Sequence, residues 1–289
     1  MTANFNFMGS RRLALGISAI LVLGSLVCFF TRGLNLGIDF TGGNVIQADF
    51  KDRPDVAKVR EAVSGVVAQE AMIQNFGEKG IIIRTNEDTE ESREQVVTVL
   101  QKSFPDMTIT GFEKVGPVVG GELRRQAFIG VSIALIAILI YITLRFQFRF
   151  AVVSVIPLVH DVIVALGFFS LTQMEISSSF IAAILTIVGY SLNNTIIILD
   201  RVRENWPSLG RDGIVTLVNR SVNQTLARTI NTTLTTLLPV IALCVWGGPV
   251  LHSFSYAMLV GIIAGTWSSM FVATGFLIEW WLAFPERKR

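Results

Sequence analysis

Ionisable side chains interrupt the long apolar segments of this chain of 289 residues. His160 and Asp161 lie near the middle of the apolar run 150–171, three residues after Pro157. An ionisable group at the centre of a membrane span costs about 2.5–3.5 kcal/mol on insertion scales, so the pair must face protein or water. Two roles are open to it. It is either a hydrogen-bonded clamp across helices at the carbonyls that Pro157 frees, or part of a proton or ion path.

A second polar group spans the apolar runs 179–199 and 229–246. The first run carries polar residues in its last turns: Tyr190, Asn193 and Asn194. A polar stripe at spacings of 4, 3 and 4, which falls on one helix face, leads into the second run: Gln224, Arg228, Asn231 and Thr235. Arg228 either snorkels to the membrane interface or joins a polar cluster with the run 179–199.

Other chemistry finds little support in the sequence. There is no GxxxxGK[ST] stretch for binding nucleotide phosphates, and His160 and His252 are the two histidines, so we expect no catalytic residues and no cofactor. Cys28 and Cys244 lie in apolar runs without metal-ligand spacing, which predicts buried apolar roles and no metal site. The net charge of +2 gives no reason to expect nucleic acid as a partner.

The composition predicts a membrane protein. Hydrophobic residues make up 51% of the chain and charged residues 16%, whereas a soluble domain carries about 25% charged residues. A spanning helix needs about 20 apolar residues. Six segments fit, the last broken by small residues: 13–30, 127–144, 150–171, 179–199, 229–246 and 254–282.

Between the first two spans lies a segment of different composition, which carries 9 Lys/Arg against 15 Asp/Glu from Gly33 to Glu122. Its patterns predict, in order, a strand, a helix, a hairpin, a second helix and a final strand: 44–50, 54–67, 72–84 with a turn at 77–80, 90–104 and 107–115. This β-α-β-β-α-β order is that of a ferredoxin-like unit. We therefore predict an α-helical membrane protein with six transmembrane helices and an external ferredoxin-like α+β domain.

The short connections indicate the orientation, because Lys and Arg in short loops stay in the cytoplasm. The loops 172–178 and 247–253 have neither residue, whereas basic residues flank the other span ends: Arg11, Arg12, Arg145, Arg149, Arg201, Arg203, Arg211, Arg220, Arg287, Lys288 and Arg289. Both termini are therefore predicted to be cytoplasmic. The divisions are 1–32, the cytoplasmic N-terminus and an uncleaved first span; 33–124, the external domain; and 125–289, the remaining spans and cytoplasmic C-terminus.

Three further segments have simple interpretations. Gly37, Asp39, Gly42 and Gly43 favour a turn, although a hinge between the membrane and external parts is also open. The run 200–204, with Asp200, Arg201 and Arg203, is typical of a solvated end of a span. The segment 213–222 has apolar residues at helical spacing, which predicts an interfacial helix.

Several of these motifs together resemble the SecF members of the SecD/SecF family. The resemblance covers residues from about Phe7 to Trp281 and rests on five segments: 37–43 (GIDFTGG), 157–161 (PLVHD), 188–193 (VGYSLN), 200–205 (DRVREN) and 223–229 (NQTLART). It implies a subunit of the bacterial Sec export machinery that belongs to the resistance-nodulation-division superfamily. With SecD, it would use the proton or sodium gradient to promote late translocation through SecYEG.

The resemblance also implies surroundings and partners. The protein would lie in the bacterial inner membrane with residues 33–124 in the periplasm. Its partners would be SecD, the SecYEG channel, the translocating polypeptide and membrane lipid, with YajC and YidC as further candidates and no nucleic acid. The implied ion-coupling cluster contains seven residues: Asn194, Arg228, Asp161, His160, Asn193, Tyr190 and Gln224. Two other classes stay open, a small-molecule exporter of the resistance-nodulation-division type and a passive membrane assembly factor.

Position 194 departs from the family pattern. The family motif reads Ser-Leu-Asn-Asp, whereas this chain has Ser191, Leu192, Asn193 and Asn194. An amide cannot lose a proton near neutral pH. The motif therefore indicates a coupling-impaired chain, either an engineered or specialised variant held in one protonation-like state or a natural protein with an altered coupling site.

Overall fold

The computed structural model describes residues 5–52, 54–67, 71–77, 79–85, 89–145 and 147–284. Among these it contains six helical spans that are long and apolar enough to cross a membrane, which confirms the predicted fold class of a multi-pass helical protein. The chain divides into two compact units, one of residues 1–35 with 131–289 and one of residues 36–130. The basic residues 287–289, on which the predicted orientation partly depends, lie outside the described residues.

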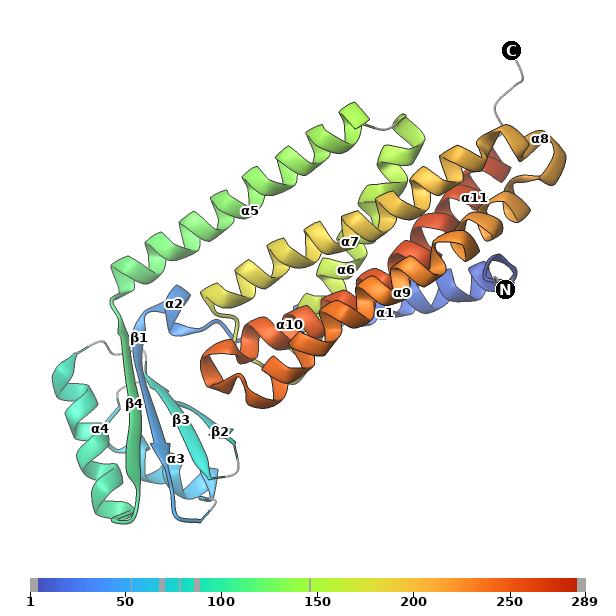
Figure 1. Ribbon diagram of the computed structural model, residues 1–289. Coiled ribbons are helices and arrows are strands. Elements are labelled where there is room, and N and C mark those ends of the chain that lie inside the picture. The colour runs from blue at the N-terminus through green and yellow to red at the C-terminus, as the bar shows by residue number, and fades with distance from the viewer. Residues whose placement is uncertain are drawn as a thin grey trace. The chain divides into compact units, whose positions relative to one another are not determined.

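Figure 1 shows the long helices of the first unit as a bundle. The bounds of the spanning helices are α1 Arg11–Arg32, α5 Pro117–Arg145, α6 Phe148–Thr172, α7 Ser178–Asn205 and α9 Ile214–Trp246, with the last span formed by α10 Gly248–Trp267, a π-helical segment Ser268–Ala273 and α11 Thr274–Ala283. Shorter helical turns are η1 Met8–Ser10, η2 Trp206–Ser208 and α8 Leu209–Asp212.

The fifth span differs from its prediction. The segment 213–222 is not a separate interfacial helix, because α9 runs without a break from Ile214. Four side chains of this first part are buried in the core of the bundle: Ile214, Leu217, Val218 and Val222. Apolar spacing in the sequence identified these residues, but the continuity with the following span comes from their packing against other helices.

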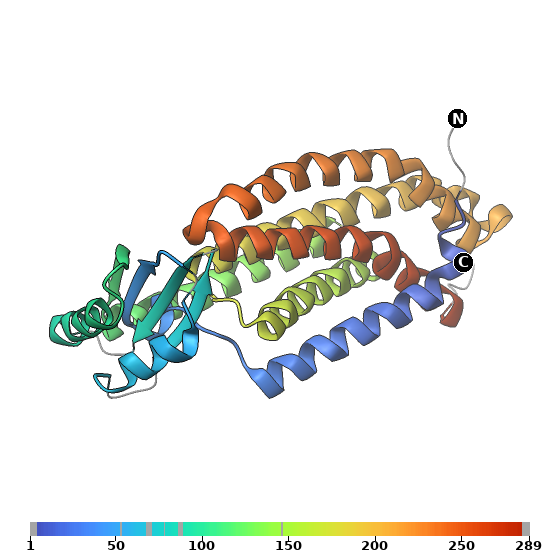
Figure 2. The same ribbon diagram turned by 90° about the horizontal axis from the view of Figure 1, so that it is seen from below.

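Two glycines let helices of the bundle approach closely. A Cβ built on Gly261 of α10 would lie 2.4 Å from Cδ1 of Ile187 on α7. A Cβ on Gly167 of α6 would lie 2.2 Å from the side chain of Ser25 on α1, and Figure 2 shows α1 running along α6. Close contact through small residues is the usual way in which membrane helices pack. These contacts hold α1 on α6 and α10 on α7.

The second unit contains the predicted β-α-β-β-α-β order. After the short helix α2 Ile38–Thr41 come β1 Gly43–Asp49, α3 Val56–Ser64, β2 Met72–Phe76, β3 Gly80–Thr85, α4 Glu90–Ser103 and β4 Thr108–Val115. The strands form one sheet in the order β2-β3-β1-β4. All neighbouring pairs are antiparallel, as in a ferredoxin-like domain. In the predicted hairpin turn 77–80, Glu78 lies outside the described residues.

The core of this unit lies between the sheet and the two helices. Its fully buried members come from β1, α3, β3 and α4: Ile46, Val59, Val63, Ile81, Ile83, Val96 and Leu100. Helix α3 is shorter than the predicted 54–67. It begins after Asp55, whose side chain caps it by accepting a hydrogen bond from the Ala57 amide, and it ends at Ser64, before Gly65. Thr89 caps α4 in the same way, because its side chain accepts a hydrogen bond from the Ser92 amide.

We expect residues 36–116 to fold on their own, since their core draws on no residue of the bundle. Chemical unfolding of this fragment, followed by circular dichroism, should show one cooperative transition. Ile83→Val should lower its free energy of unfolding by about 0.5–1.5 kcal/mol. The exposed Lys102→Ala should change it by less than about 0.5 kcal/mol. A fragment without a cooperative transition would show that the domain depends on the membrane part.

Candidate functional site

Asp161 lies at the centre of a polar cluster inside the bundle, with 1% of its surface exposed. Its Oδ2 accepts hydrogen bonds from Ser191 Oγ of α7 at 2.5 Å and from Ser268 Oγ at 2.8 Å. Its Oδ1 lies 2.8 Å from Nδ1 of His160. The carboxyl group of α6 is therefore bound to α7 and to the start of the π-helical segment.

The backbone around this carboxyl group is shaped to admit it. Gly265 of α10 has no side chain, and a Cβ there would lie 3.2 Å from Ser191 Cβ and 3.3 Å from Asp161 Oδ2. Ser268, one turn later, is the first residue of the π-helical segment. A π-helical turn inserts an extra residue into a helix and is frequent at functional sites. The break in the last span thus coincides with the residue that donates to Asp161.

His160 completes the cluster from the same helix. It is 6% exposed, and its Nε2 is buried without a hydrogen-bond partner among the described residues. The predicted neighbours His160 and Asp161 therefore contact each other, and the pair joins helices through the hydroxyl groups of Ser191 and Ser268. Such an arrangement can hold a carboxylate in a membrane, because each hydroxyl replaces a hydrogen bond to water.

A second polar chain begins beside this cluster. Tyr190 of α7 donates its hydroxyl to Thr233 Oγ1 at 3.1 Å, and Thr233 Oγ1 lies 3.0 Å from Thr266 Oγ1 of α10. The sequence identified Tyr190 and missed both threonines. Their signal was available but weak, since threonine often bonds its own helix backbone and is common in apolar spans.

Asn194 lies one helical turn further along α7 and is fully buried. Neither its Nδ2 nor its Oδ1 makes a hydrogen bond to any residue that the structure describes. The contacts Tyr190–Thr233 and Arg201–Gln224 fix the register of α7 against α9 and place Asn194 at the level of Thr229. The hydroxyl of Thr229 is also buried without a partner among the described residues. Two levels of buried polar groups thus lie along α7.

The remaining cluster residues lie apart from these levels. Arg228 and Asn193 are exposed, and within the described ranges the Arg228 guanidinium forms no ion pair. Gln224 is also exposed, and its Oε1 accepts hydrogen bonds from Arg201 Nε at 2.7 Å and Asn205 Nδ2 at 2.8 Å. The structure therefore brings Asp161 and His160 into a buried network and Tyr190 into a part-buried one, and it does not join Asn194 to Arg228.

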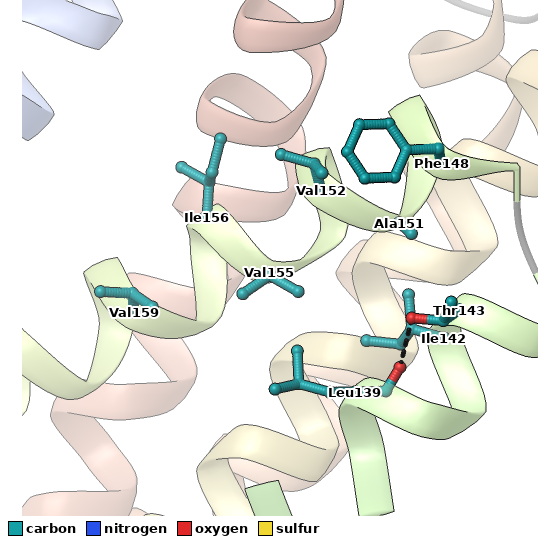
Figure 3. Close-up of a pocket in the computed structure, with 9 residues that line it drawn as sticks. All are labelled: Leu139, Ile142, Thr143, Phe148, Ala151, Val152, Val155, Ile156 and Val159. Carbon is teal, nitrogen blue, oxygen red and sulfur yellow. Dashed lines mark hydrogen bonds between the residues drawn. The ribbon is translucent and has the colours of Figure 1, made fainter. Parts of the chain in front are cut away.

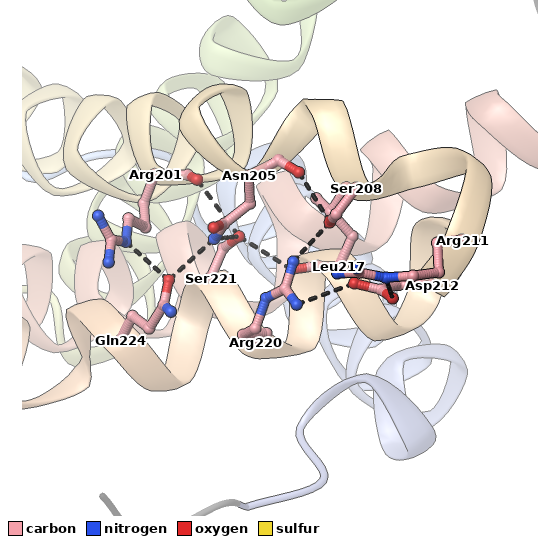
Figure 4. Close-up of polar contacts among 9 residues, drawn as sticks. All are labelled: Arg201, Asn205, Ser208, Arg211, Asp212, Leu217, Arg220, Ser221 and Gln224. Carbon is pink, nitrogen blue, oxygen red and sulfur yellow. Dashed lines mark hydrogen bonds and ion pairs between the residues drawn. The ribbon is translucent and has the colours of Figure 1, made fainter.

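The basic end of the bundle carries its own network, drawn in Figure 4. Asn205 donates to Ser221 Oγ at 2.9 Å and thereby ties the end of α7 to α9. Arg220 of α9 pairs with Asp212 of α8 at 2.8 Å. Asp200 lies 3.8 Å from the Arg145 guanidinium at the end of α5, and Arg203 is exposed. Ion pairs near the surface add at most about 1 kcal/mol each to the free energy of unfolding. Their main effect is to fix the positions of the helix ends.

The glycine motif forms a tight turn. Gly37 precedes α2, and Gly42 and Gly43 follow α2 with φ angles of 73° and 124°, which side chains disfavour. A Cβ built on Gly120 of α5 would lie 2.9 Å from the Gly42 amide nitrogen. Asp39 lies in α2 itself. The motif thus has the predicted turn geometry, while a hinge role stays a prediction.

Metal ligands do not gather in the part of the chain that the structure describes, where no three His, Cys, Asp or Glu side chains could hold a metal ion together. The chemistry that the geometry offers is proton or cation exchange at Asp161, whereas Asn194 is a buried amide without a hydrogen-bond partner among the described residues.

Family models match two parts of the chain. The model of the C-terminal part of the SecD/SecF protein export membrane proteins matches residues 95–283, and the SecD/SecF GG motif matches residues 29–52. The second match contains the tight turn around Gly42 and Gly43, and the first contains both polar levels of the bundle.

Relatives match over nearly the whole chain. The protein translocase subunit SecF of Desulfurispirillum indicum is 42% identical, over 95% of this chain and 91% of its own. SecF of Pseudomonas aeruginosa is 41% identical, over 96% of this chain and 91% of its own. The crystal structure of SecDF, a translocon-associated membrane protein from Thermus thermophilus, matches with a TM-score of 0.88 and 38% identity. This chain is 96% covered by that match and spans 39% of the SecDF chain.

Removing the serine hydroxyls should loosen the Asp161 cluster. We expect Ser191→Ala and Ser268→Ala each to lower the free energy of unfolding in detergent by about 1.5–3 kcal/mol, as for hydrogen bonds to charged groups. Ser154→Ala is the matched control, because this buried serine of α6 donates to the backbone carbonyl of Phe150.

A double-mutant cycle separates the contact from general packing. Combined with Asp161→Ala, each serine substitution should cost clearly less than it does alone, since the carboxylate that it served is gone. Costs that simply add would show that the serines do not act through Asp161.

Proposed function

Because the chain belongs to the SecD/SecF family of protein export membrane proteins, we propose that it is the SecF-type subunit of a bacterial protein translocase. It acts in the inner membrane as a transport component and catalyses no covalent reaction. Both termini lie in the cytoplasm and residues 33–124 in the periplasm, where the ferredoxin-like domain contacts exported polypeptide. The positive-inside distribution of its short loops supports this orientation.

A SecD-type subunit is the main partner in this proposal. Helix α9 exposes a polar stripe that leads into its apolar run: Gln224, Arg228, Asn231 and Thr235. Polar groups on a spanning helix are costly against lipid and usually face another protein segment or water. The complementary half of a transporter built from repeats would cover this stripe. Together the two halves would act on the SecYEG channel, with YajC and YidC as accessory partners.

The energy for export comes from the proton or sodium gradient. Moving one charge through the membrane potential is worth about 2.3 kcal/mol per 100 mV, and a buried carboxylate can take up and release such a charge. Asp161 of α6 has this chemistry and is hydrogen-bonded to α7 and to the last span. Asn194, at the level of Thr229, lacks it.

Position 194 supports an impaired coupling step. The Asn194 amide is fully buried among groups that offer it no hydrogen bond within the described residues, and a buried polar group without a partner points to a functional role at that position. An aspartate there could bind and release a proton at the level of Thr229 of α9, the residue that follows Arg228. The amide instead resembles the protonated state and holds the helices near the conformation that this state selects.

Restoring the carboxylate tests this proposal. Asn194→Asp, reconstituted with SecD and SecYEG in vesicles, should gain export that depends on an imposed gradient, whereas the parent chain should show little. Arg228→Ala in the restored background should abolish the gain, and Arg203→Ala, which removes an exposed arginine elsewhere, should not. Translocation is measured as protease-protected substrate with and without the gradient.

If the parent chain already couples export to the gradient, position 194 is not the coupling site. Asp161→Asn should then abolish the gradient dependence, which would place the coupling at the His160–Asp161 pair. If neither Asn194→Asp nor Asp161→Asn changes the gradient dependence of translocation, the result would contradict gradient coupling by this chain.

A further inference from the structure

An apolar groove runs between α5 and α6 (Figure 3). It consists of two adjoining cavities of about 500 Å³ and 250 Å³, which share Leu139, Val155 and Val159. Among the described residues that line it, Thr143 carries a hydroxyl, which donates to the Leu139 carbonyl of its own helix at 2.7 Å. The lining that the structure describes is thus almost wholly apolar and suits a hydrocarbon chain.

A basic and aromatic cavity adjoins one end of the groove. This cavity of about 240 Å³ shares Phe148 with the groove and is also lined by Gln147, Arg149, Trp206 and Trp281. The Arg149 guanidinium lies 5.2 Å from the centre of the Trp281 ring, which holds it at this end. Arg145, the last residue of α5, lies at the same end, where its guanidinium is 3.8 Å from the Asp200 carboxylate.

We propose that the groove and this cavity together bind one anionic phospholipid, with an acyl chain between α5 and α6 and the phosphate at Arg149. The charge of the cavity fits a phosphate, which arginine binds well. Basic pockets between spanning helices are typical sites for anionic lipid head groups. A polypeptide fits less well, because the described lining, which is almost wholly apolar, would leave its backbone groups without hydrogen-bond partners.

The packing of α5 explains why such a lipid would matter. The helix is almost wholly exposed, with 6% of its span buried. Its contacts with the bundle core come from its later turns, at Ile138 and the fully buried Ile142. An acyl chain in the groove would supply the dispersion contacts that the α5 side chains lack on this face. The lipid would therefore fasten the second span to the bundle, independently of how export is driven.

Native mass spectrometry of the full-length chain tests the proposal. The purified, delipidated protein is titrated separately with dioleoyl-phosphatidylglycerol and dioleoyl-phosphatidylcholine, and the first bound lipid is quantified. We expect phosphatidylglycerol to bind about fivefold more tightly, since one arginine near a lipid surface has an effect of that order. Arg149→Gln should remove this preference, whereas Arg203→Gln, an exposed arginine outside the cavity, should keep it.

A second pair of variants tests the groove itself. Val159→Phe places a ring where the two cavities meet and should weaken binding of both lipids at least fivefold. Ile136→Phe adds a ring to an exposed residue of α5 outside the lining and should leave binding unchanged. Equal binding of the two lipids by the parent chain, or full binding by Val159→Phe, would overturn the proposal.

Discussion

The bundle depends on a carboxyl group that must be kept inside an apolar environment. Burying an unpaired charge in a membrane is costly, and Asp161 is tolerated because Ser191, Ser268 and His160 surround it. These contacts join α6, α7 and the last span at one point. Gly265 and the π-helical segment follow from the same need, since the first admits the carboxyl group and the second begins at the serine that donates to it.

Helix α7 also connects the two polar levels, that of Asp161 and Ser191 and that of Asn194 and Thr229. Ser191 and Asn194 lie on α7 one turn apart, and both are fully buried. Tyr190 links the same stretch of α7 to Thr233 of α9 and, through it, to Thr266 of α10. A charge gained or lost at either level would therefore alter hydrogen bonds between the helices that hold the other.

The sequence predicted the elements well where local pattern decides them. The spans follow from uninterrupted apolar runs, and the order of strands and helices in the 36–130 unit follows from alternation, helical spacing and turn residues. Small residues interrupt the apolar run of the last span in the sequence, but the helix continues through them, and the π-helical segment Ser268–Ala273 was not predicted.

What the sequence could not predict depends on contacts between distant segments. Ser268 is one of many small polar residues in an apolar run, and only its distance from Asp161 distinguishes it. The early start of α9 at Ile214 results from burial of Leu217 and Val218 in the bundle core. The stripe on α9 was identified correctly as one face, but spacing alone could not tell that this face points away from the bundle.

The most direct test of the Asp161 cluster measures the distance between the helices that it joins. Nitroxide labels would be placed at the exposed positions Leu171 of α6 and Ile263 of α10, after Cys28 and Cys244 are replaced by alanine, and read by double electron–electron resonance in lipid nanodiscs. We expect one narrow distance distribution in the parent and in Ser154→Ala, and a broader or shifted one in Asp161→Ala. An unchanged narrow distribution in Asp161→Ala would contradict the central role of this carboxyl group.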